Sequence, residues 1–105
     1  MERSIFDIQA EFCRAMGNAN RLEIMHLLRE RPMTVSEIME ALALNQSMVS
    51  RQLSVLRSVG VVTGERDGNA VHYHLTDETI GDVCDLVRKV LTDQVQKRSN
   101  VLGNL

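Results

Sequence analysis

The chain has 105 residues, a length that predicts one domain whose core is large enough to fold without disulfides or metals. No apolar run approaches the roughly 20 residues of a membrane-spanning helix, and residues 1–12 lack a signal-peptide core. We therefore expect a cytoplasmic protein without membrane association. The net charge of −2 is not that of a strongly basic nucleic-acid binder, so the distribution of charge along the chain matters more than its sum. The aromatic content of 3% predicts a core of Leu, Val, Ile and Met.

Two helices are predicted in the first third of the chain. The first spans residues 4–16 and carries an apolar stripe that includes Phe6 and Phe12. Residues 17–20 end this helix and supply an N-cap, either Asn18 or Asn20, for a second helix over 21–31. The only proline, Pro32, forces a break after the second helix.

A short helix, a tight turn and a longer helix are predicted over residues 34–58. Thr34 and Glu37 have the spacing of a capping box at the start of the short helix. Asn45 is a good N-cap for the longer helix, and Gly60 is a typical residue to end it. The apolar residues that face inward from this longer helix are Val49, Leu53 and Leu56.

The opposite face of the longer helix has the composition of a surface that binds duplex DNA. Gln can pair with adenine and Arg with guanine in the major groove, while Ser reaches base edges or phosphate. No carboxylate lies between Ala41 and Gly64, so phosphates would meet no like charge there. We predict a helix-turn-helix whose second helix enters the groove. The DNA-binding residues on this helix are Gln46, Ser47, Ser50, Arg51, Ser54 and Arg57.

Residues 61–75 read as a two-stranded hairpin, which we call the wing. Asp67 and Gly68 between alternating strands are a strong hairpin signal. His72 and His74 alternate on the second strand and share a face, so strand surface, a phosphate contact and a metal site are alternatives for them. The expected fold is mainly α with a small β-hairpin, a single winged helix-turn-helix domain over residues 1–105.

The last predicted helix spans residues 78–97 and is followed by a flexible tail, 99–105. Its apolar positions repeat at nearly heptad spacing. Together with the first helix it either closes the core of a monomer or builds a twofold dimer. A dimer would present two recognition helices about one turn of DNA apart, matching a palindromic operator.

The chain resembles the ArsR/SmtB family of small bacterial winged-helix repressors. The matching segments are residues 16–24, 44–53, 56–62 and 68–75. The resemblance implies homodimers that form through the first and last helices (4–16 and 78–97), bind operator DNA and release it on metal, metalloid or thiol chemistry. It also implies that Arg66 and Asn69, in the wing, lie near the flanking DNA backbone, with Gln46, Ser47, Ser50 and Arg51 reading bases or phosphates.

The sequence departs from the family in its turn and in its metal sites. Ala43 stands where such turns often have glycine, and a left-handed conformation there would cost about 1 kcal/mol. The family's thiol-rich site falls on residues 33–37, which contain no cysteine. Its zinc site matches Asp77, but the other ligand positions hold Thr79, Val90 and Asp93. We therefore expect neither a metal site nor a cofactor.

Two cysteines remain as candidate sensor residues. Cys13 lies on the first helix and Cys84 on the last. They are either small core residues, a switchable dithiol, or part of a metalloid or soft-metal site.

The predicted function is a homodimeric DNA-binding transcriptional regulator, a repressor, released by oxidant or reactive sulfur chemistry at Cys13 and Cys84. The alternatives are a metalloid- or soft-metal-responsive repressor and a winged-helix module that binds another protein. The recognition face lacks the aromatic anchors of protein interfaces, and the chain has no Cys-x-x-Cys or phosphate-binding glycine loop that would indicate an enzyme. The expected partners are double-stranded DNA and a second copy of the chain, and the sequence points to no particular inducer.

Overall fold

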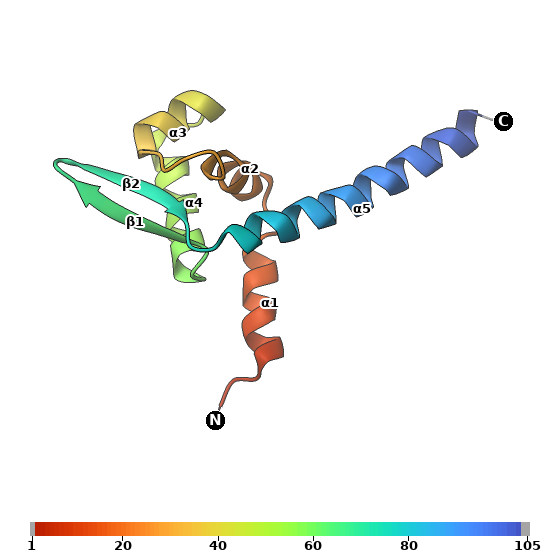
Figure 1. Ribbon diagram of the computed structural model, residues 1–105, viewed down its shortest axis with the longest axis horizontal. Helices are drawn as coiled ribbons and strands as arrows, with labels where there is room; N and C mark the ends of the chain where they lie inside the picture. The colour runs from red at the N-terminus through yellow and green to blue at the C-terminus, as the bar shows by residue number, and fades with distance from the viewer. Residues whose placement is uncertain (1, 104–105) are drawn as a thin grey trace.

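The structure is a computed structural model that describes residues 2–103. Within these residues it has five helices and one antiparallel sheet of two strands (Figure 1). In chain order the elements are α1 (Ile5–Ala15), α2 (Ala19–Leu28), α3 (Val35–Leu42), α4 (Gln46–Ser58), β1 (Val62–Asp67), β2 (Ala70–Leu75) and α5 (Glu78–Gly103). This arrangement confirms the predicted winged helix-turn-helix.

The predicted side chains cap the helices. Asn18, not Asn20, caps α2. In α3, the Thr34 hydroxyl accepts the Glu37 N–H at 3.2 Å, and the Glu37 carboxylate accepts the Thr34 N–H at 3.0 Å. Asn45 accepts an N–H from the first turn of α4 at 2.8 Å. Because a helix start otherwise leaves four N–H groups without partners, these contacts determine where α2, α3 and α4 begin.

The turn between α3 and α4 contains the one strained backbone position among residues 2–103. Ala43 has φ 54° and ψ 42°, so it adopts the left-handed conformation considered from the sequence. This conformation costs an alanine about 1 kcal/mol. The turn therefore depends on the packing of the two helices that it joins.

The core lies between α2, α3, α4 and the base of the hairpin. Its buried residues are all aliphatic or methionine, as the low aromatic content predicted. The three predicted inner residues of α4 belong to it. The members are Ile24, Met25, Leu28, Met33, Ile38, Val49, Leu53, Leu56, Val61 and Val62.

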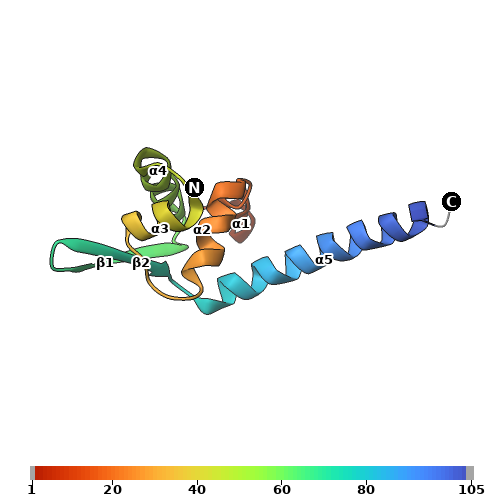
Figure 2. The same cartoon turned by 90° about the horizontal axis from the view of Figure 1, so that it is seen from above.

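The base of the wing is held against this core, and its tip projects away from the helices (Figures 1 and 2). β1 and β2 pair from Val62 with Leu75 to Asp67 with Ala70. Gly68, the first residue of the two-residue turn, has φ 64°, a conformation that glycine adopts without strain. Tyr73 exchanges backbone hydrogen bonds of 2.8 and 3.0 Å with Met33, which lies just before Thr34, the N-cap of α3.

α1 and α5 leave most of their apolar residues exposed. The radius of gyration is 16.6 Å, against about 13 Å for a compact chain of this length, and α5 extends away from the body in both views (Figures 1 and 2). The alternative that these helices close the core of a monomer is therefore wrong for most of their length. The exposed residues are Ile5, Phe6, Ile8, Val83, Leu86, Val87, Val90, Leu91, Val95 and Val101.

Two predicted boundaries are wrong. α5 continues to Gly103 and does not end at residue 97, so residues 99–103 of the predicted flexible tail are helical. Lys97 and Arg98 resemble a last helical turn, but no Gly or Pro follows them before Gly103. Residues 104–105 of the predicted tail lie outside the described residues. α2 ends at Leu28, earlier than the predicted Arg31, because the chain turns before Pro32.

None of the helices within residues 2–103 has the length and apolar character needed to cross a membrane.

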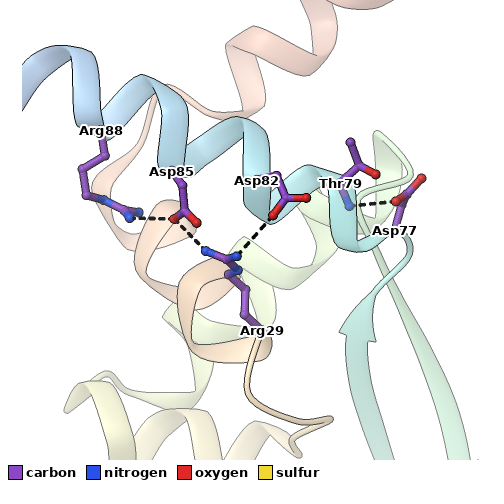
Figure 3. A network of polar contacts seen from close by, with 6 residues as sticks. All are labelled: Arg29, Asp77, Thr79, Asp82, Asp85 and Arg88. Atoms are coloured by element: carbon purple, nitrogen blue, oxygen red, sulfur yellow. Dashed lines mark hydrogen bonds and ion pairs between the residues drawn. The ribbon is translucent and has the colours of Figure 1, made fainter.

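A charged cluster joins α2 to the start of α5 (Figure 3). Arg29 contacts Asp85 at 2.6 Å and Asp82 at 3.6 Å, and Arg88 contacts Asp85 at 3.1 Å. Gly81 permits this approach, because a Cβ atom there would collide with the Arg29 side chain. The hydrogen bond from Arg29 lowers the pKa of Asp85. The cluster therefore sets how α5 leaves the body of the protein.

The lowered pKa of Asp85 predicts a loss of stability in acid. A carboxyl group whose pKa is lower in the folded state stabilises the fold above its unfolded value of about 4. That contribution is lost as the pH falls through the lower, folded value. We expect the urea midpoint to fall on acidification from about pH 5 to pH 3, and to fall less steeply in Asp85→Asn. Asp93→Asn is the matched control, because Asp93 pairs only with the neighbouring Lys89 of the same helix. Equal slopes in both variants would contradict this role of Asp85.

Candidate nucleic-acid interface

α4 separates its buried and exposed residues cleanly. At about 100° per residue, the six predicted DNA-binding positions of α4 cover an arc of roughly 140°. All six are exposed: Gln46, Ser47, Ser50, Arg51, Ser54 and Arg57. The opposite arc holds the buried residues Val49, Gln52, Leu53 and Leu56. The cap at Asn45 fixes where α4 starts, and thereby places Gln46 and Ser47 on its first turn.

Arg57 lies at the end of this surface that is next to the wing. Its guanidinium carbon is 6.0 Å from the centre of the Tyr73 ring, within reach of a cation–π contact. The ring packs on Gly64, where a Cβ atom would come within 3.0 Å of it. Arg57 therefore connects α4 to the wing, in addition to its predicted role toward DNA.

The predicted wing residues Arg66 and Asn69 are also exposed. Arg66 lies in β1 next to its last residue, and Asn69 belongs to the turn at the tip. Further back, His74 lies 3.4 Å from Glu65, and His72 is paired with Glu65 in the strand register. No group of three or more metal-binding side chains occurs within residues 2–103.

Sequence reasoning missed one buried polar residue in α4. Gln52 is 6% exposed and accepts a hydrogen bond of 2.8 Å from Arg21 of α2. The sequence does contain a signal for the burial of Gln52. It lies three residues after Val49 and next to Leu53, and this spacing places it within the apolar face of the helix.

The two cysteines contribute to the same cavity between α1 and α5. This cavity has a volume of about 300 Å³. It is lined by Phe12 and Cys13 of α1, Met16 after its end, Leu22 of α2, and Val83, Cys84, Val87, Arg88 and Leu91 of α5. Both thiols are free, with Cys13 exposed and Cys84 partly buried. Burial raises the pKa of the Cys84 thiol, although Arg88 and Arg29 oppose this effect. The arrangement therefore brings both cysteines to one cavity, but it does not lower the pKa of the Cys84 thiol, as activation as a nucleophile would require.

Asp77, the one residue that matches the zinc site of the resembled family, caps α5. Its carboxylate accepts the Thr79 N–H at 2.8 Å, a hydrogen bond that lowers the pKa of Asp77 (Figure 3). Asp77 therefore has a structural role at the start of this helix.

Comparison with known proteins identifies the family. The family model described as "Bacterial regulatory protein, arsR family" matches residues 18–63. The HTH-type transcriptional regulator Rv0081 of Mycobacterium tuberculosis, itself uncharacterised, is 36% identical over 96% of this chain and 90% of its own. Its crystal structure superposes with a TM-score of 0.82, at 35% identity over 92% of this chain and 98% of that chain.

Two further relatives carry more informative names. The HTH-type transcriptional repressor SmtB of M. tuberculosis is 40% identical to this chain. The matched region covers 77% of this chain and 60% of the repressor. The homodimeric winged helix-turn-helix DNA-binding domain of Mb0332 from Mycobacterium bovis has a TM-score of 0.81, at 28% identity over 89% of this chain and 86% of that domain. The chain therefore belongs to the ArsR/SmtB family of winged helix-turn-helix proteins, and it is a DNA-binding transcriptional regulator rather than an enzyme.

Proposed function

We propose that this protein is a cytoplasmic, homodimeric repressor that binds a palindromic operator through α4 and the wing. The observation that carries this proposal is the exposed, acid-free face of α4, which presents Gln46, Arg51 and three serines. These side chains can pair with adenine and guanine edges or donate to phosphates. Arg66 and Asn69 contact the backbone beside each half-site.

The homodimer forms through α1 and α5. Many of their apolar residues are exposed, and an accumulation of exposed apolar residues marks an interface. The M. bovis relative of similar fold is itself homodimeric. A twofold pair of α4 helices reads a sequence with the same symmetry, so the operator is a palindrome.

A DNA-binding titration across salt concentrations tests this function. With about four phosphate contacts per dimer, affinity should fall on the order of 100-fold between about 50 and 200 mM salt. Duplexes selected by the protein from a random pool should bind about a thousandfold or more tightly than unselected DNA. Equal affinity for both pools, or binding without salt dependence, contradicts the proposal and favours a winged-helix module that contacts another protein.

Thiol chemistry at Cys13 and Cys84 is the proposed release mechanism. Both side chains line one cavity between the helices of the proposed dimer interface. Hydrogen peroxide would oxidise the exposed Cys13 thiol to a sulfenic acid with release of one water, and the Cys84 thiol would then displace a second water to form a disulfide. The new bond would tie α1 to α5 and change the spacing of the recognition helices.

We expect peroxide treatment to reduce operator affinity in the wild-type protein and to leave it unchanged in Cys84→Ser. Mass spectrometry of the treated protein should show the loss of two hydrogens between these cysteines. Reduction with dithiothreitol should restore binding and serves as the control. A Cys84→Ser protein that still responds fully would exclude this mechanism. A response to arsenite but not to peroxide would support the metalloid-responsive alternative instead.

A further inference from the structure

One arginine side chain joins the end of α1 to the middle of α4. In the first turn of α2, Arg21 donates from Nε to the Ala15 carbonyl at 2.5 Å and from Nη2 to the Arg14 carbonyl at 3.4 Å. From Nη1 it donates to Oε1 of Gln52 at 2.8 Å. The carbonyls at the end of a helix lack helical partners and carry a partial negative charge, so they are suited to a guanidinium.

The Gln52 amide extends this connection to the start of α4. Gln52 is the one polar side chain that is buried within residues 2–103. Its Nε2 donates to the Met48 sulfur at 3.3 Å, and the Met48 N–H donates to the N-cap Asn45 at 2.8 Å. Hydrogen bonds, joined through the side chain of Met48, therefore connect the end of α1 to the turn of α4 that carries Gln46 and Ser47.

These hydrogen bonds constrain direction as well as distance. α1 otherwise meets the core through apolar side chains, including Phe12 and Met16, whose packing tolerates rotation. The guanidinium of Arg21 is planar and presents its donors in a fixed fork, so bonds on both sides restrict the angle between α1 and α4. Removing the acceptor at Gln52 would also leave a partly buried charged donor without a partner, which is costly.

We propose that Arg21 and Gln52 are positioning residues for operator recognition. By fixing α4 relative to α1, they set the distance and angle between the two recognition helices of the homodimer. This inference rests on the proposed function, because the distance matters only when a dimer reads two half-sites. Neither residue contacts DNA in this role.

The test compares duplexes whose two half-sites are separated by different numbers of base pairs. The half-sites come from duplexes that the wild-type protein selects from a random pool, and a duplex with a single half-site is included. Gln52→Met keeps the length of the side chain but removes the acceptor for Arg21. We expect it to bind the optimally spaced duplex about tenfold more weakly, the effect of losing a hydrogen bond to a charged group. The affinity for the single half-site should not change, so the preference for one spacing should weaken or shift.

Two further variants serve as controls. Gln52→Glu retains an acceptor for Arg21 and should restore the wild-type spacing preference. Arg21→Met breaks the same contact from α2 and should reproduce the effect of Gln52→Met. If one of the two variants folds poorly, the other still tests the proposal. Urea midpoints and sedimentation give the fraction of folded dimer in each preparation.

An equal loss of affinity for every duplex, the single half-site included, would overturn the proposal and assign these residues a purely structural role. An unchanged spacing preference in Gln52→Met and Arg21→Met would also overturn it. Failure of the wild-type protein to select any duplex would instead reject the proposed function, so the two failures are distinguishable.

Discussion

Arg51→Ala is expected to bind operator DNA about 5- to 150-fold more weakly than the wild-type protein. Loss of an arginine contact to a base edge or phosphate costs about 1–3 kcal/mol. Arg51 is exposed on the face of α4 that carries no carboxylate, so its removal should leave the core intact. Gln46→Ala should cost a similar amount through the loss of a contact at the first turn of the same helix. Fluorescence anisotropy with selected duplexes measures both effects.

The loss of affinity across different DNA sequences distinguishes a base contact of Arg51 from a phosphate contact. If Arg51 reads a base, Arg51→Ala should lose discrimination at one position of each half-site. If it contacts phosphate, the loss should be uniform across sequences and the salt dependence should be shallower. Arg98→Ala, at the exposed end of α5, removes the same charge away from α4 and should bind normally. Unchanged affinity in both Arg51→Ala and Gln46→Ala would contradict the assignment of α4 to the major groove.

The double variant Val87→Asp/Leu91→Asp is expected to be a monomer that binds operator DNA at least about 100-fold more weakly. Both residues lie on the exposed apolar stripe of α5, at 55% and 54% exposure. A buried carboxylate without a partner is unfavourable in an apolar interface, so association should fail. A monomer reads one half-site and loses the gain that comes from linking two binding events. Sedimentation velocity and DNA titration measure the two losses.

Gln96→Asp is the matched control for this experiment. It introduces a carboxylate into the same helix, at an exposed position on the face opposite Val87 and Leu91. This variant should remain dimeric. A double variant that stays dimeric would place the interface elsewhere and would remove the proposed role of α5.

The parts of the fold that depend on local sequence were predictable. The caps at Thr34 and Asn45, the glycine end of α4 and the tight turn of the wing at Gly68 each depend on residues only a few positions apart. Asp67, which was expected in this turn, is the last residue of β1. The inner face of α4 followed from spacing alone, because a helix repeats every 3.6 residues. These features place the surface proposed to bind DNA.

The parts that depend on contacts between distant residues were not predictable. The Arg21–Gln52 bond joins residues 31 positions apart, and the Arg29–Asp85 contact joins residues 56 positions apart. No local pattern in the sequence specifies that either arginine contacts that particular partner. The end of α5 was missed for a different reason: two cations resembled a last turn, although no glycine or proline followed them before Gly103. The roles of Gln46, Arg51 and the two cysteines stay predictions.

The close fit of Arg29 over Gly81 has a consequence for the history of the sequence. A methyl group at position 81 would displace the guanidinium from Asp82 and Asp85, and a shorter side chain at position 29 would remove the reason for glycine. Relatives that keep arginine at 29 in this contact should therefore also keep glycine at 81, although Arg29 caps the end of α2 and Gly81 lies in α5.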